Sequence, residues 1–438
     1  MARRRREPET ARIEAVTHDG RGIAAIQGKK VFVSGALPGE EVRFQRRKMR
    51  RNYDEAELLE ILQAAPDRIE ARCAAYGRCG GCALQHVSQE QQRQIKSQTL
   101  KDNLERIGQV EPERWLDPII GPGWNYRRRA RLAVKDVHAK GRVLVGFRER
   151  HAPYITDMHR CEVLANPVDG MIDPLSELIG QLSISARLPQ IEVAVADNAV
   201  ALVFRVLDAP SQDDRALLST FGKANDVRIY LQPGGLDSIT QLYPETAQDA
   251  LYYDLPEFEV RIAFDATGFV QVNNEINRLM VSKAVELLNP GADDRVLDLF
   301  CGIGNFSLPL ARRAASVLGV EGEASLVRAA GDNAVLNDLS NVSFRQADLN
   351  GIDGSESWLR QGWDLVLLDP ARSGAAEIAN CIATIGPRRI VYVSCHPGTL
   401  ARDAGTLVNE KGYRCEAAGI IDMFPHTAHV ESIAVFDK

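Results

Sequence analysis

The sequence contains no apolar run that approaches the roughly 20 residues needed to cross a membrane. Its first ten residues, MARRRREPET, are basic but are followed by no hydrophobic segment, so a secretory leader is not expected. Internal repeats and extended low-complexity segments are also missing. With 438 residues and a hydrophobic content of 45%, the chain is expected to be a cytoplasmic globular protein of two or three domains.

The chain also lacks an overall positive charge, since its formal net charge is −6. The charge is uneven, however: residues 1–150 carry 31 Lys and Arg against 20 Asp and Glu, a balance of +11, and the remainder carries −17. The basic residues gather at 3–6, 43–51 and 126–131. Such clusters neutralise phosphates, which favours a nucleic-acid partner; a solvated charged face, or a disordered tail at 3–6, would give the same pattern.

Three regions differ in pattern, and together they predict a multidomain α/β protein. Residues 1–64 show a basic tail and then short strands with glycine-rich turns, which is typical of a small β-barrel of the oligonucleotide-binding type. Residues 65–262 are predicted to form an α+β central domain, although its helix at 88–108 is expected to pack on the catalytic domain. Residues 263–438 alternate apolar strands with helices, which indicates a doubly wound parallel sheet.

The segment VLDLFCGIGNFSLPLA predicts a strand, a tight turn at Gly302 and Gly304, and a helix. The third glycine of the dinucleotide fingerprint is missing. Acidic residues end three successive predicted strands, at Glu321, Asp348 and Asp369. Three acids would repel a pyrophosphate, so they favour a cationic nucleoside such as S-adenosylmethionine; as an alternative, each acid could cap the helix that follows it.

A cysteine ends the later strand IVYVSC, at the edge where ligands bind in such sheets. Cys395 is followed two residues on by a proline, and Arg372 is expected to raise its thiolate fraction. A thiol beside a methyl sulfonium suits methylation of a poorly nucleophilic carbon such as C5 of uracil. Thiolate addition at C6 activates C5, and a base must then remove the C5 proton; Glu431, in an apolar strand, is the candidate base. An ion pair at a strand start is the alternative role for Glu431.

The segments LDLFCGIGNFSLPLA, GVEG, LLDPARSGA, VYVSCHPGTLARD, DMFPHTAHVES and FVQVNNEIN resemble the motifs of the RNA uracil-C5 methyltransferases. The resemblance implies a Rossmann-like class I methyltransferase domain, with Cys395 as nucleophile and Glu431 as base. It implies S-adenosylmethionine contacts from Gln271, Phe300, Asn305, Glu321, Asp348 and Asp369. One departure is His396, because the family usually has asparagine before this proline.

A second group of cysteines has the spacing C-x5-C-x2-C, with a fourth far downstream: Cys73, Cys79, Cys82 and Cys161. Four thiolates suit a [4Fe–4S] cluster or a structural zinc ion, and spacing alone leaves both open. The resemblance of CAAYGRCGGC to the family's cluster-bearing members implies the iron–sulfur cluster, as a structural element and part of the RNA surface. A barrel (TRAM) domain and a cluster together resemble the family's 23S rRNA members. The other cysteines of apolar segments are expected to fill space.

The sequence thus predicts a monomeric enzyme that methylates C5 of a uridine in 23S rRNA through a cysteine–C6 adduct, with the target base extruded from the RNA. Two alternatives stay open. The substrate could be tRNA or a second rRNA site, or the chain could be a cluster-bearing RNA-binding protein without turnover.

Overall fold

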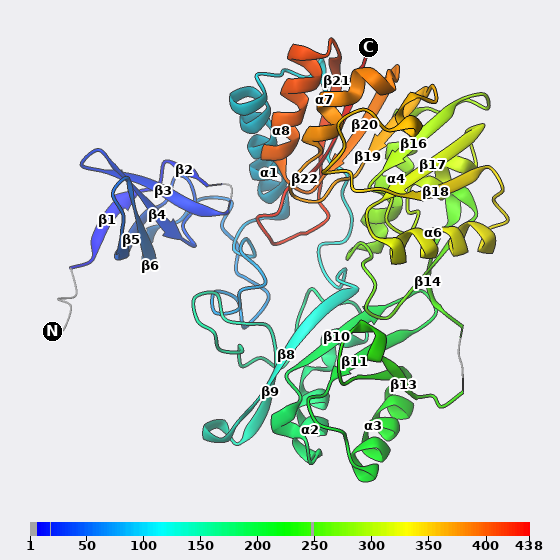
Figure 1. The fold of residues 1–438 in the computed structure, drawn as a ribbon. Coiled ribbons are helices and arrows are strands. Elements are labelled where there is room, and N and C mark those ends of the chain that lie inside the picture. The colour runs from blue at the N-terminus through cyan, green and yellow to red at the C-terminus, as the bar shows by residue number, and fades with distance from the viewer. Residues whose placement is uncertain (1–6, 18, 247–248) are drawn as a thin grey trace.

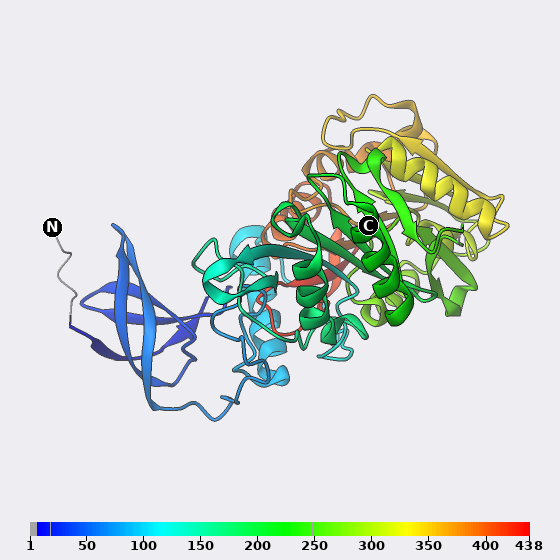
Figure 2. The same ribbon diagram turned by 90° about the horizontal axis from the view of Figure 1, so that it is seen from below.

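The structure is a computed structural model that describes residues 7–17, 19–246 and 249–438, arranged in three regions (Figures 1 and 2). The basic stretch at 3–6 lies outside the described residues. Among the helices of the described part, none combines the length and apolar character of a membrane span.

The first region is a curved six-stranded sheet that stands to one side of the molecule in both views. Its strand order is β1-β5-β6-β4-β3-β2. Alternate residues of β5, Val42 and Phe44, are fully buried, so the period-2 pattern of the sequence produces the core. The strands are β1 (Glu9–Arg12), β2 (Ala15–Val16), β3 (Arg21–Ile26), β4 (Lys29–Ser34), β5 (Glu41–Met49) and β6 (Tyr53–Gln63).

The basic cluster at 43–51 lies mostly on β5, and its basic residues on that strand pair with acids of the same sheet. Arg46 bonds to Glu9 at 2.7 Å and also to the buried Asp54, while Arg43 pairs with Glu60 at 2.8 Å. The cluster at 126–131 is similar, because two of its arginines pair with acids of neighbouring strands and loops. Local charge in the sequence therefore overstates the charge available for phosphates.

The central region is a six-stranded, mostly antiparallel sheet of order β13-β12-β11-β10-β8-β9. Only β11 and β12 are parallel, joined by a helix that begins with a capping box at Ser211. The elements are β8 (Arg129–Val137), β9 (Arg142–Gly146), α2 (Ile172–Gln181), β10 (Gln190–Val195), β11 (Val200–Arg205), α3 (Gln212–Asn225), β12 (Val227–Gln232) and β13 (Thr240–Tyr243).

The third region is an eight-stranded sheet of order β18-β17-β16-β19-β20-β22-β21-β7. Its first five strands in that order are parallel, and β22 runs antiparallel to both β20 and β21. Neighbouring strand residues face opposite cores: Val296 packs with α4 and α5, and Leu297 packs with α1, α7 and α8. The elements are α4 (Asn274–Leu288), β16 (Arg295–Leu299), α5 (Ser307–Ala311), β17 (Ser316–Glu321), α6 (Ala324–Leu336), β18 (Val342–Gln346), β19 (Leu365–Leu368), α7 (Ala376–Ile385), β20 (Arg389–Ser394), α8 (Pro397–Gly405), β21 (Arg414–Ile421) and β22 (Glu431–Asp437).

Three earlier segments complete this third region. Helix α1 (Gln89–Asn103) and the π-helical turn after it lie beside α8 (Figure 1). The approach is close, because a Cβ at Gly108 would lie 2.5 Å from the carbonyl oxygen of Ala401. Strand β7 (Arg114–Trp115) adds to β21, and the hairpin of β14 (Leu251–Leu255) and β15 (Val260–Phe264) packs into the same core as α4. Parts of 65–262 thus pack with the third region, and one of them, β7, joins its sheet.

Candidate active site and cysteine cavity

The candidate catalytic residues meet at one edge of the eight-stranded sheet. Strands β16, β19 and β20 pair in parallel, and Phe300, Asp369 and Cys395, respectively, are the first residues after them. The antiparallel strand β22 begins at Glu431, next to the end of β20. The topology therefore brings the candidate nucleophile and the candidate base to neighbouring strand ends.

The glycine turn after β16 is held by one of the candidate cofactor residues. Phe300 and Gly302 both adopt positive φ, at 65° and 55°. The backbone N–H of Gly302 donates to Glu321 at 3.1 Å, and the N–H of Gly322 donates to the other carboxylate oxygen at 2.7 Å. Glu321 thus organises the turn. It does not cap the following helix, because the N-cap of α6 is Glu323, and the side chain of Glu323 makes no capping hydrogen bond.

The remaining cofactor candidates differ in their surroundings. Asn305 accepts a hydrogen bond from the hydroxyl of buried Tyr253 at 2.9 Å and bonds the amide of Asn277 in both directions. Asp348 is exposed after β18, and its carboxylate accepts from a backbone N–H two residues on. Gln271 is partly exposed on the segment between β15 and α4. The sequence did not single out the partners of Asn305, which come from different elements.

Three acids near this edge have raised pKa values. The pKa of buried Glu431 is raised to about 8, mainly by desolvation and also by nearby Asp369, while Lys96 opposes the shift. Desolvation likewise raises the pKa of Asp369 to about 7. Asp298, inside β16, has a pKa raised to about 7 by burial, and one of its oxygens has no hydrogen-bond partner in the described chain. An acid within the apolar run VLDLF was the signal for Asp298, which sequence reasoning missed.

The environment of Cys395 disfavours its thiolate in the free protein. Burial raises the pKa of this thiol to about 11, and the negative charges of Glu431 and Asp369 contribute, while Arg372 lowers it by less. The expectation that Arg372 favours the thiolate is confirmed, but burial and the two carboxylates outweigh its effect. Arg372 donates instead to the ring of His429 at 2.9 Å.

His396, at the position where the resemblance leads one to expect asparagine, caps a helix. It is the N-cap of α8, and its Nδ1 accepts a hydrogen bond from the backbone N–H of Thr399 at 3.2 Å. Asparagine is a preferred N-cap because its side-chain oxygen accepts the same kind of bond. The substitution therefore preserves the helix start directly behind Cys395.

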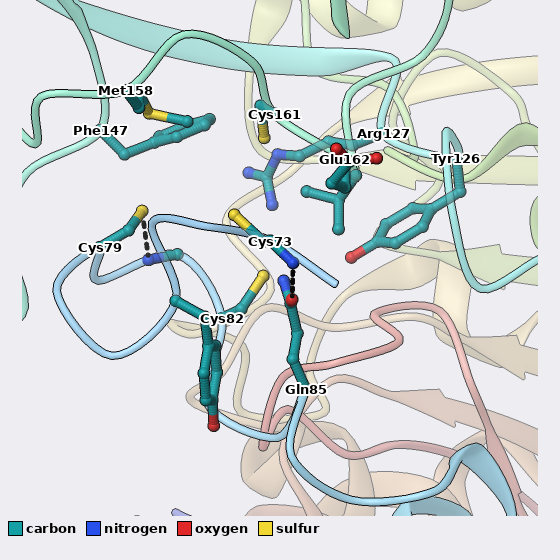
Figure 3. Close-up of a pocket in the computed structure, with 13 residues that line it drawn as sticks. Cys73, Cys79, Cys82, Gln85, Tyr126, Arg127, Phe147, Met158, Cys161 and Glu162 are labelled. Carbon is teal, nitrogen blue, oxygen red and sulfur yellow. Dashed lines mark hydrogen bonds between the residues drawn. The ribbon is translucent and has the colours of Figure 1, made fainter. Parts of the chain in front are cut away.

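The second cysteine group lines one cavity of about 100 Å³ in the central region (Figure 3). Cys73, Cys79 and Cys82 come from one irregular segment, and Cys161 comes from the loop after β9. Figure 3 shows their sulfurs around a common space. As placed, no three or more His, Cys, Asp or Glu side chains of the described residues form a group that could hold a metal ion.

Comparison with known proteins agrees with this architecture. The family model described as tRNA (Uracil-5-)-methyltransferase matches residues 248–438, and the TRAM domain model matches residues 2–59. The chain is 51% identical over 432 residues to 23S rRNA (uracil(1939)-C(5))-methyltransferase RlmD of Methylococcus capsulatus, covering 99% of this chain and 97% of that protein. It is 50% identical to RlmD of Alkalilimnicola ehrlichii, covering 100% and 99%.

Among solved structures, the chain resembles Pyrococcus abyssi tRNA (uracil-54, C5)-methyltransferase in complex with S-adenosyl-L-homocysteine. The TM-score is 0.75 at 24% identity, covering 98% of this chain and 100% of that one. The two chains therefore share one fold over nearly their full length.

Proposed function

This chain belongs to the family of S-adenosylmethionine-dependent RNA (uracil-C5)-methyltransferases, and from that premise we propose that it methylates C5 of a uridine in 23S rRNA. The rRNA substrate is favoured because the full-length relatives at about 50% identity carry that activity in their names. A tRNA substrate is the alternative, and side-by-side assays on 23S rRNA and tRNA transcripts separate the two.

The observation that carries the proposed chemistry is the meeting of Cys395 and Glu431 at adjacent strand ends. The Cys395 thiol loses its proton to solvent, and the thiolate adds to C6 of the uracil. The electron pair displaced to C5 then attacks the methyl group of S-adenosylmethionine, and S-adenosylhomocysteine leaves. Glu431 then takes the C5 proton, the C6–S bond breaks, and the thiolate returns to Cys395. A base with a pKa of about 8 suits this last step at neutral to mildly alkaline pH.

We assign the cofactor to the same edge, where Glu321, Asp348 and Asp369 follow successive strands. Their negative charge favours a sulfonium nucleoside, and the glycine turn permits close approach of the backbone. Gln271, Phe300 and Asn305 complete the proposed contacts. Calorimetric titration with S-adenosylmethionine is expected to show weakened binding in Glu321→Gln and unchanged binding in a Cys381→Ser control.

The covalent step is tested with an rRNA transcript containing 5-fluorouridine, because fluorine at C5 cannot be removed as a proton. Wild-type protein with S-adenosylmethionine should form an adduct that survives denaturing electrophoresis, and Cys395→Ala should form none. Cys381→Ser is the matched control, since Cys381 is a partly exposed thiol on α7. An adduct on Cys395→Ala, or methylation by it, would overturn the mechanism.

The four cysteines around the central cavity are proposed to hold a [4Fe–4S] cluster. Their donor set consists of thiols alone, which fits a cluster or zinc. The resemblance of the segment CAAYGRCGGC to the family's cluster-bearing members favours the cluster over zinc. Methyl transfer is redox-neutral, so a bound cluster would tie Cys161 to the 73–82 segment rather than supply electrons. Protein purified without oxygen should be brown and contain iron and sulfide; a colourless protein with zinc would reverse the assignment.

A further inference from the structure

Helix α1 carries a buried cation to the edge of the active site. Lys96 is 1% exposed, and its ammonium donates to the carboxylate of Asp422 at 2.6 Å and to the carbonyl of Phe424 at 2.9 Å. A buried ion pair is costly to desolvate and is weak support for stability on its own. The ion pair lies next to the candidate base Glu431, which suggests a role in the reaction.

The ion pair lies beside the strand position that holds Glu431. Asp422 directly follows β21, whose last residue, Ile421, is paired with Glu431 in the sheet. The chain between them, residues 422–430, forms a loop that returns to Glu431. Lys96 therefore contacts Asp422 at the start of the loop, and its positive charge lowers the pKa of Glu431 at the end of the loop.

A second residue of α1 holds the same loop. Gln92, one turn before Lys96, accepts a hydrogen bond from the backbone N–H of His426 at 2.8 Å, and its amide nitrogen lies 3.2 Å from Nδ1 of that ring. The amide also donates to two carbonyls of the segment before α1, at Leu84 and Val87. Gln92 and Lys96, two buried polar side chains of α1, thus hold the loop 422–430 in place. Helix α1 itself lies outside residues 248–438, the part matched by the methyltransferase family model.

We propose that Lys96 is a positioning residue for proton abstraction. Its positive charge is partly neutralised by Asp422, and the remainder determines how readily Glu431 takes the C5 proton. The inference rests on the proposed function, because it takes Glu431 as the base. The charged groups that act on Glu431 are Lys96 from α1 and Asp369 at the β19 end, and Glu431 in turn acts on Cys395 at the β20 end. Asp422 enters through Lys96, whose charge it neutralises in the ion pair.

Two substitutions break the same ion pair but change the charge near Glu431 in opposite directions. Lys96→Met removes a positive charge, so Glu431 should hold its proton to higher pH. Asp422→Asn removes a negative charge and leaves Lys96 in place, so Glu431 should ionise at lower pH. A purely structural role would make both variants change in the same direction, because both lose the same contact.

The experiment uses full-length protein and an rRNA transcript tritiated at uridine C5, and measures single-turnover tritium release against pH. The acid-side midpoint should rise by on the order of one pH unit in Lys96→Met and fall in Asp422→Asn. Lys96→Arg should keep the wild-type midpoint, and the double variant K96M/D422N should lie near it. Shifts of the same sign, or no shifts, would overturn the inference.

Adduct formation on the 5-fluorouridine transcript provides the second readout, since it stops before proton abstraction. Each variant should form the adduct within about threefold of the wild-type rate, which also shows that it is folded. If the wild-type protein forms no adduct, the proposed function fails. If all variants form it and the midpoints do not separate, the proposed function stands and the role of Lys96 is refuted.

Discussion

The resting state of the Cys395 thiol gives a quantitative test of the active-site electrostatics. The surroundings raise its pKa from 9.0 to about 11, a difference of two pH units. At pH 8, below both values, this lowers the thiolate population about 100-fold relative to an ordinary cysteine. Because the thiolate is the reactive form, carbamidomethylation of Cys395 by iodoacetamide should be slower by about the same factor.

The charges that raise this pKa can be removed one at a time. Glu431→Gln takes away a neighbouring negative charge, so its alkylation midpoint should fall, whereas Arg372→Ala should raise it. The rates are followed by mass spectrometry of the Cys395 peptide between pH 8 and 11, with an exposed cysteine peptide as reference. A wild-type midpoint near 9 that does not move in Glu431→Gln would refute this account of the resting thiol.

Three further outcomes concern stability. Burial lowers the pKa of His426 to about 4, so the unfolded chain binds a proton at this residue before the folded chain does as the pH falls below 6.5. Amide exchange at Leu84, whose N–H donates to the His426 carbonyl, should therefore lose about 20-fold protection between pH 7 and 5, and His426→Gln should lose less. Asp54→Ala removes a buried partner of two cations in the barrel, so β4–β6 amides should open at about 3 kcal/mol lower cost by hydrogen exchange. Gly319→Ala would place a Cβ 2.6 Å from the Phe344 ring, and calorimetry should show a destabilisation of about 1–3 kcal/mol.

Strand-end chemistry could be predicted from the sequence because it depends on local order. Cys395 and Asp369 each follow an apolar strand of a parallel sheet, and topology alone brings such ends together. Lys96 could not be predicted in the same way, because the segment QEQQRQIKSQTLKDN has the polar composition of an exposed helix. Its burial depends on a loop more than 300 residues away, which no local pattern encodes.

For the basic clusters the error is the opposite one, because local composition overestimates the positive charge that is free to bind phosphates. Counting charge along β5 ignores Glu9 and Asp54, which reach the same arginine from other strands. The four cavity cysteines fall between these cases. The spacing of Cys73, Cys79 and Cys82 predicts a ligand group, but the approach of Cys161 depends on tertiary structure.

The pairing of β7 with β21 has a consequence for biosynthesis. Arg114 finds its strand partner at Ala417, about 300 residues later in the chain. At translation speeds of roughly 5–20 residues per second, that partner emerges about 15–60 s after β7. During this interval the side of α1 that is buried in the folded protein has no sheet to cover it. The nascent chain should therefore be most sensitive to proteases and most dependent on chaperones before its last two strands are made.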